Sequence, residues 1–249
     1  MMRWLWTDRA TAPILAAELL TRHVCAHPNT VLGLPTGRSA LYMYRHLAEL
    51  NRAGVVSFRD VTTFNLDEYV GLSETHPGSY HTYMRQHFLQ EFDVRQNRVH
   101  IPNGTAPDLD RECESYDTAI RQKGGWDLVV LGLGRDGHIA FNEPGTPPHV
   151  RTHVATLTQS TREDNRTDFP EGAQPPECAI TVGIGTILEA RSVILLATGD
   201  GKGAALQALG RGAIDDGVPV TFLTRHGDVT VVADQSLWFK ATEPLTAAV

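Results

Sequence analysis

The sequence predicts a doubly wound α/β fold, in which a mostly parallel sheet carries helices on both faces. Short apolar runs alternate with segments of helical period along the chain, a pattern typical of such a sheet. Hydrophobic residues make up 41% of the 249 residues, enough to bury one large core. No linker-like stretch divides the chain, so we expect residues 1–249 to form a single domain.

Seven strands are expected, each a short apolar run bounded by turn-forming residues. They cover residues 3–7, 30–34, 61–66, 128–132, 192–197, 218–223 and 229–233. The alternating segment 151–157 is a candidate for an additional strand.

Three of the helices between these strands begin at a recognisable cap, namely Asp8, Ser79 and Asp108. Apolar residues that follow each cap at helical spacing are expected to face the core. These positions are Ala12, Ala16, Leu19, Leu20, Val24, Tyr80, Met84, Phe88, Phe92, Leu109, Cys113, Tyr116 and Ile120. The third helix is expected to end at Gly124 and Gly125.

Ligands of doubly wound sheets bind outside the carboxyl ends of the strands, where the strand order reverses. Four segments that follow predicted strands are dense in polar and charged residues. These segments are 35–39, 67–69, 136–143 and 198–202. We expect them to meet at one edge of the sheet and to form a pocket.

Two cations in these segments, Arg38 and Lys202, fall where a helix should begin. The start of a helix carries positive partial charge, so a cation is unfavourable there unless an anion binds. The backbone amides of residues 36–39 and the Ser39 hydroxyl would suit a phosphate group. In the alternative interpretation, Gly37 and Gly199 are simple turn residues and both cations extend into water. The presence of two such loops favours phosphate.

The same segments contain groups for proton transfer. Asp67 and Glu68 are adjacent in an extended segment and point oppositely, so we expect Asp67 to enter the pocket and Glu68 to pair elsewhere. Asp136 and His138 are two residues apart and can face one side, where a carboxylate would fix the tautomer of the ring. Glu143 is expected to hold the ring from the opposite side.

The segment from Asp136 to Glu143 has other interpretations. It is also compatible with a satisfied polar loop or with a metal site, but one histidine and two carboxylates are too generic to specify a metal, and none is expected. The glycines of 132–137 match a dinucleotide-binding motif. That motif requires a helix at its third glycine, for which Pro144 leaves no room, and Asp136 would repel a pyrophosphate.

The composition excludes several classes of protein. The chain has 22 Lys and Arg against 29 Asp and Glu, a net charge of −7, which argues against a nucleic-acid-binding surface. It has no signal-peptide pattern and no run of 18 apolar residues, so we expect a cytoplasmic protein without membrane contact. Cys25, Cys113 and Cys178 have no metal-ligand spacing and are expected to be reduced.

Together these residues predict a small-molecule ligand with a phosphate at one end and a proton-transfer centre at the other, most simply a sugar phosphate. Carboxylates around the pocket would also suit an ammonium group. Five segments carry a resemblance to the glucosamine/galactosamine-6-phosphate isomerase family, which contains glucosamine-6-phosphate deaminases and 6-phosphogluconolactonases. They are 32–37 (LGLPTG), 64–72 (FNLDEYVGL), 76–81 (HPGSYH), 134–144 (GRDGHIAFNEP) and 179–186 (AITVGIGT).

The resemblance implies a three-layer Rossmann-like sheet and a deaminase that converts glucosamine 6-phosphate and water to fructose 6-phosphate and ammonia without a metal or organic cofactor. It implies that Asp67 moves the C2 proton to C1, and that His138, held by Asp136 and Glu143, opens the sugar ring. A flap around residues 160–178 would close over the substrate. The residues implied in phosphate binding are Thr36, Gly37, Arg38, Ser39, Arg166 and Lys202.

The sequence departs from the family pattern at several positions. Arg38 stands where a small residue is common, so the loop gains a cation. Regulated members bind N-acetylglucosamine 6-phosphate through a serine and an Arg-x-Lys pair, where this chain has Thr146, His153 and Ala155. We therefore do not expect that regulation, and the oligomeric state stays open.

Three alternative functions are considered. A 6-phosphogluconolactonase would share the fold and the phosphate end, but the segments 67–69 and 139–144 favour the deaminase. A non-catalytic sugar-phosphate sensor domain would not need Asp67, Asp136, His138 and Glu143 together, and we expect no DNA-binding segment before the fold. A galactosamine-6-phosphate deaminase differs by one inverted hydroxyl, which the sequence leaves open.

Overall fold

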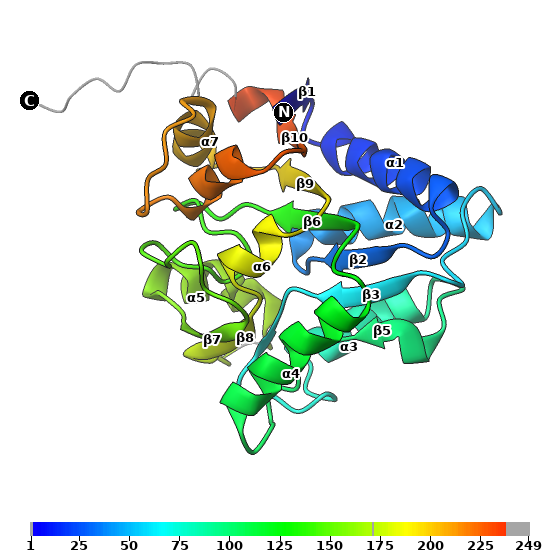
Figure 1. Cartoon of the computed structure of the whole chain (residues 1–249), viewed down its shortest axis with the longest axis horizontal. Helices are drawn as coiled ribbons and strands as arrows, with labels where there is room; N and C mark the ends of the chain where they lie inside the picture. Colours follow the sequence, from blue (N-terminus) through cyan, green and yellow to red (C-terminus); the bar gives the residue numbers. More distant parts are fainter. Residues whose placement is uncertain (1, 171, 238–249) are drawn as a thin grey trace, which may run out of the picture.

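A seven-stranded, wholly parallel sheet runs through the centre of this computed structural model (Figure 1), which describes residues 2–170 and 172–237. The strand order is β1-β10-β9-β6-β2-β3-β5. The bounds are β1 Met2–Thr7, β2 Val31–Leu34, β3 Thr62–Asn65, β5 Val99–His100, β6 Leu128–Gly132, β9 Ser192–Ala197 and β10 Val229–Asp234. The chain moves outward from β2 to β3 and β5 and then returns to β6, so the strand order reverses between β2 and β6.

Helices cover both faces of this sheet and make the fold a three-layer, Rossmann-like α/β structure, as expected. One face packs on α1 (Thr11–Ala26), α2 (Arg38–Arg52) and α3 (Tyr80–Met84). The other packs on α4 (Leu109–Gln122), α6 (Ile184–Leu188) and α7 (Gly203–Gly210). Successive strand residues alternate between the two cores, which is why most positions of the central strands β2, β6 and β9 are apolar.

A second, smaller sheet lies beside the first and was only partly expected. It is antiparallel, in the order β4 (Asp67–Tyr69), β8 (Cys178–Thr181) and β7 (His153–Thr156). The expected additional strand at 151–157 is confirmed as β7. The expected strand 61–66 ends at Asn65, after which the chain leaves the large sheet and enters the small one.

The expected strand at 218–223 is wrong, since this segment forms the 3-10 helix η4 (Pro219–Arg225). Pro219 lacks a backbone donor and occupies the first turn, where its fixed φ favours a helix. The Thr221 hydroxyl donates to the carbonyls of Asp215 and Val218, which completes the turn. The segment is buried against α7, and burial accounts for its apolar composition in either conformation.

Ser79 and Asp108 occupy the N-cap positions of their helices as expected, whereas the N-cap of α1 is Ala10 and the expected cap Asp8 lies two residues before it. Asp8 accepts hydrogen bonds from the backbone N–H groups of residues 10 and 11, at 3.0 and 2.9 Å. Ser79 accepts from Thr82 N at 3.1 Å, and Asp108 accepts from Arg111 N at 3.0 Å. The remaining helices are η1 Arg85–Leu89, a π-helical continuation of α3, η2 Gln96–Arg98, α5 Gln159–Asn165, η3 Arg166–Asp168 and η5 Gln235–Leu237.

Two further expectations concern the whole chain. None of the helices in the described part of the chain is long and apolar enough to cross a membrane. The single domain expected over residues 1–249 includes residues 1, 171 and 238–249, which lie outside the described residues, as does one position of the expected flap.

A buried carboxylate, Asp117, ties the outer helix α4 to the small sheet. It is 3% exposed and accepts hydrogen bonds from Arg151 Nε at 2.7 Å, Thr152 Oγ1 at 2.9 Å and Thr186 Oγ1 at 2.8 Å. Burial raises the pKa of Asp117, but these donors outweigh burial and lower it below its ordinary value. The charged form therefore stabilises the fold above the ordinary pKa, and this contribution is lost as the pH falls through the folded pKa.

We predict that Asp117→Ala lowers the free energy of unfolding by about 3 kcal/mol, because the buried Thr152 and Thr186 hydroxyls lose their acceptor and Arg151 loses one of its two carboxylate partners. Urea unfolding at neutral pH measures this change. Glu114→Ala is the control, since Glu114 is an exposed residue of the same helix and should change stability little. Equal decreases in the free energy of unfolding of the two variants would contradict the stabilising role of Asp117.

Candidate active site

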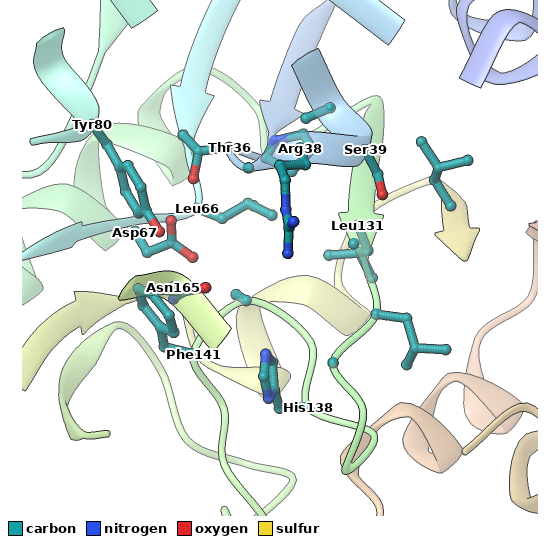
Figure 2. A pocket seen from close by; sticks show the side chains of 18 of the residues that line it. Thr36, Arg38, Ser39, Leu66, Asp67, Tyr80, Leu131, His138, Phe141 and Asn165 are labelled. Carbon is teal, nitrogen blue, oxygen red and sulfur yellow. The ribbon is translucent and has the colours of Figure 1, made fainter. Parts of the chain in front are cut away.

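A cavity of about 170 Å³ lies at the carboxyl ends of β2 and β6, where the strand order reverses (Figure 2). A larger cavity of about 800 Å³ shares part of its lining and extends toward Arg9 and Tyr42. All four segments singled out in the sequence contribute to these cavities. Their contributions are Pro35, Thr36, Gly37, Arg38, Ser39, Asp67, His138, Ala140, Phe141, Thr198, Gly199, Asp200 and Lys202.

The loop before α2 forms one wall of the cavity. Gly37 has a φ of 94°, in the left-handed region that favours glycine, and it turns the chain from β2 into the helix. Its carbonyl accepts a hydrogen bond from the Tyr83 hydroxyl at 2.8 Å, and the Ser39 hydroxyl lies 2.6 Å from Thr198 Oγ1. No side chain caps α2, so the first backbone N–H groups of this helix remain available for an anion.

Two cations face this wall without a counter-ion. Figure 2 shows the Arg38 side chain extending from the start of α2 toward the middle of the cavity. Burial lowers the pKa of Lys202 to about 8, with the charge of Arg38 as the next contribution. Among the described residues, neither Arg38 nor Lys202 makes a side-chain hydrogen bond or an ion pair. Two unpaired cations at one cavity make an anion-binding site.

Asp67 lies at the other end of the cavity, beside Tyr80 (Figure 2). It is the first residue of β4 and is 6% exposed. Burial, assisted by the charge of Glu68, raises the pKa of Asp67 to about 8. A carboxyl group with such a pKa exchanges protons near neutral pH, as a general base requires.

Glu68 points away from the cavity and anchors the chain, as expected from the alternation along an extended segment. Its carboxylate accepts three backbone hydrogen bonds, from Tyr69 N at 2.8 Å and from Tyr80 N and His81 N at 3.0 Å each. Burial raises the pKa of Glu68 to about 7 and outweighs the effect of these donors. The bonds hold β4 against the start of α3 and so fix the neighbouring Asp67.

His138 faces the cavity, and Asp136 supports it from behind. His138 Nδ1 lies 2.7 Å from Asp136 Oδ1, which also accepts from the His138 backbone N–H at 3.1 Å. Burial raises the pKa of Asp136, but the hydrogen bond and charge of His138 outweigh burial and lower it to about 2. Because Nδ1 lies against Asp136, Nε2 is the ring nitrogen left for a ligand.

The glycines of this segment make room for the imidazole. A Cβ on Gly134 would lie 2.3 Å from the His138 ring, and one on Gly137, which has a φ of 90°, would lie 2.5 Å from Val218 Cγ1. No helix begins at Gly137 in the described chain. The dinucleotide-binding interpretation is therefore excluded.

Glu143 lies close to the Asp136–His138 pair, but its hydrogen-bond partner is Thr158 at the start of α5 and not the imidazole that it was expected to hold. It accepts hydrogen bonds from Thr158 N at 3.1 Å and from Thr158 Oγ1 at 3.4 Å, and Thr158 also caps α5. Ligand atoms of Glu143, Asp136 and His138 lie within 4.8 Å of one another, so a cation could fit between them. The existing partners of Asp136 and Glu143 already account for this geometry without a metal.

Residues 9–232 match the family described as glucosamine-6-phosphate isomerases/6-phosphogluconolactonase. The chain belongs to this family. It is 44% identical over 220 residues to a glucosamine-6-phosphate deaminase of Thermoanaerobacter sp., covering 88% of this chain and 87% of that protein. It is 45% identical over 220 residues to a glucosamine-6-phosphate deaminase of Bacillus velezensis, covering 88% and 91%.

Solved structures of related proteins have the same fold. A monomeric glucosamine-6-phosphate deaminase superposes with a TM-score of 0.91 at 40% identity, covering 96% of this family member and 99% of that chain. A 6-phosphogluconolactonase from Trypanosoma cruzi superposes with a TM-score of 0.77 at 20% identity, covering 99% and 98%. The second similarity shows the fold alone.

The segment 160–178, expected to be a flap, presents different residues to the cavity from those expected. Arg166 is exposed at the start of η3 and does not line either cavity. Asn165 and Asp168 line both, and Asn165 Nδ2 donates to the Tyr69 hydroxyl at 3.0 Å. Tyr80 also lines the inner cavity, although its helical spacing predicted only a core position.

We predict that infrared difference spectra of this family member contain a protonated carboxyl band that disappears as the pH rises through about 8, because burial holds the Asp67 proton. The component that titrates near pH 8 should be absent in Asp67→Asn, whereas the band of Glu68, with a pKa of about 7, should remain. Both should remain in Glu74→Gln, which removes an exposed acid. A titration of Asp67 near pH 4, its ordinary range, would contradict the effect of burial.

Proposed function

We propose that this protein is a glucosamine-6-phosphate deaminase, which converts glucosamine 6-phosphate and water to fructose 6-phosphate and ammonia. The observation that carries the proposal is the meeting of Asp67 and His138 with the unpaired cations Arg38 and Lys202 in adjoining cavities. The names of relatives at 40 to 45% identity support it. We place the protein in the cytoplasm under this proposal, in keeping with a phosphorylated metabolite as substrate.

The reaction begins with opening of the sugar ring. His138 transfers the proton of the C1 hydroxyl to the ring oxygen through Nε2, while Asp136 at 2.7 Å from Nδ1 stabilises the ring when it carries both protons. Glu143 lies behind this pair and keeps the loop against the flap. The product is the open-chain amino aldehyde.

Asp67 then performs the isomerisation. Its carboxylate takes the proton from C2, which the neighbouring aldehyde acidifies, and returns it to C1. The C1 oxygen is protonated, the C2 amine gives up one proton and becomes an imine, water then adds to C2, and ammonia leaves to give the ketose. A buried carboxylate suits this role because its raised pKa makes it a stronger base.

The phosphate is held at the opposite end of the site. Arg38, Lys202, the Ser39 hydroxyl and the free N–H groups at the start of α2 supply the donors. Arg166 is not assigned to this end, because it does not line the cavity. No residue of the proposed mechanism requires a metal or an organic cofactor.

We predict that the purified protein releases ammonia from glucosamine 6-phosphate, and that Asp67→Asn lowers kcat by about 10²- to 10⁴-fold while retaining sugar-phosphate binding, because it removes the base and little volume. A coupled ammonia assay measures ammonia release and kcat, and calorimetric titration with fructose 6-phosphate measures binding. Glu49→Gln in α2 is the control, because Glu49 is an exposed acid that does not line the cavity, and this variant should leave kcat unchanged.

Parallel assays separate the alternatives. Hydrolysis of 6-phosphogluconolactone without ammonia release would overturn the proposal in favour of a lactonase. Faster turnover of galactosamine 6-phosphate would reassign the substrate to the other epimer. Binding of sugar phosphates without turnover of any of them would indicate a sensor domain.

We predict that kcat/KM has a maximum near pH 8. Activity rises with pH as Asp67 loses its proton and falls as Lys202 loses its own, and both groups have a pKa of about 8. Lys202→Arg keeps its charge at higher pH, so the falling limb should shift upward in rate assays across pH. An unchanged falling limb would remove Lys202 from phosphate binding.

A further inference from the structure

The flap places an acidic residue, Asp168, at the phosphate end of the site. Asp168 is the last residue of η3 and lines both cavities together with Arg38 and Lys202. In the described part of the chain its carboxylate makes no hydrogen bond or ion pair. The phosphate end therefore contains two cations and one carboxylate that have no direct partner.

The backbone on both sides of Asp168 is held in place through Tyr69. Asn165 Nδ2 donates to the Tyr69 hydroxyl at 3.0 Å, and the Phe169 ring packs edge-on against the Tyr69 ring with centroids 5.2 Å apart. Phe169 is buried in the small core beside the second sheet. Asp168 is thus directed to the cavity by its fixed neighbours.

A carboxylate at this position would repel a bound phosphate unless a cation lies between them. The Asp168 side chain remains accessible to solvent, yet its carboxyl group lies deep enough for burial to raise its pKa, an effect that the charge of Arg38 opposes. Arg38 carries five N–H donors in a planar fork, so it can bond to two anions along different edges. Lys202 offers a single point charge and cannot bridge in this way.

We infer that Asp168 is a positioning residue for Arg38 in substrate binding. The carboxylate pairs with one edge of the guanidinium and directs its other edge to the phosphate, so that the flap contributes to phosphate recognition through an acid. This inference rests on the proposed function for the identity of the substrate. It assigns to Asp168 and Arg38 together the role that the family resemblance gives to a flap arginine.

The test compares Arg38→Ala, Asp168→Asn and the double variant by calorimetric titration with fructose 6-phosphate and by steady-state kinetics with glucosamine 6-phosphate. Arg38→Ala should weaken binding about 10- to 100-fold, as expected for a charged hydrogen-bonded contact. Asp168→Asn should weaken binding and raise KM about 5- to 10-fold with kcat within about twofold. The double variant should bind no more weakly than Arg38→Ala, because Asp168 acts only through Arg38.

Matched controls come from the same elements. Glu163→Gln removes an exposed acid from the flap helix, and Arg52→Ala removes an exposed arginine from the far end of α2; neither should change affinity. Fructose without phosphate, used as a second probe, should bind equally to all variants. Thermal unfolding of each variant confirms that the fold is retained.

Two outcomes would overturn the inference. Tighter binding of fructose 6-phosphate by Asp168→Asn would show that the carboxylate only repels phosphate. Multiplying losses in the double variant would show that Asp168 and Arg38 act independently. If the protein releases ammonia but the effects of Asp168→Asn and Arg38→Ala on binding are independent, this inference alone is rejected. If the two effects on binding are coupled but no ammonia is released, only the proposed function is rejected.

Discussion

The backbone of Leu66 forms hydrogen bonds to both sheets, and the site depends on this double attachment. Its N–H donates to Leu34 O at the end of β2, and its carbonyl accepts from Val182 N just after β8. One residue thereby joins the large parallel sheet to the small antiparallel one. The next residue, Asp67, emerges at the junction, where a carboxylate can be buried and still face a cavity. Three backbone N–H groups donate to the neighbouring Glu68 carboxylate, and these bonds hold the backbone beside Asp67 in place.

The electrostatics of the site follow from burial without pairing. Burial moves both Asp67 and Lys202 toward their neutral forms, so the empty protein does not carry the full cost of isolated buried charges. Asp136 is the opposite case, because its imidazole partner holds it ionised. A substrate with an ammonium group at one end and a phosphate at the other offers a counter-charge to each unpaired group. The unpaired charged groups of the site would thus find their counter-charges on the ligand and not within the protein.

Much of this arrangement could be predicted from the sequence, because it depends on local patterns. The alternation of apolar runs and helical segments gave the layers, and the position of polar segments at strand ends brought Asp67, His138, Arg38 and Lys202 to one edge. The single-residue alternation correctly separated Asp67 from Glu68. These inferences need only the geometry of strands and the rule that parallel strands end together.

Features that depend on tertiary context were not predictable in the same way. The apolar run 218–223 satisfies either a strand or a helix, and only its packing against α7 decides between them. That Asp168 and not Arg166 lines the cavities depends on how η3 is rotated, and the contacts of Phe169 and Asn165 with Tyr69 fix this rotation. The transition between sheets at Leu66 has no signal in composition, since both flanking segments are extended.

Thr158 connects α5 to the surroundings of His138, because it bonds to both α5 and Glu143. Its side chain caps α5, and its N–H group donates to Glu143, which lies beside the Asp136–His138 pair. Displacement of α5 must therefore release Glu143 as well. A ligand that changed the position of α5 would change this contact beside the imidazole, and the coupling free energy between the two places would be the same in both directions.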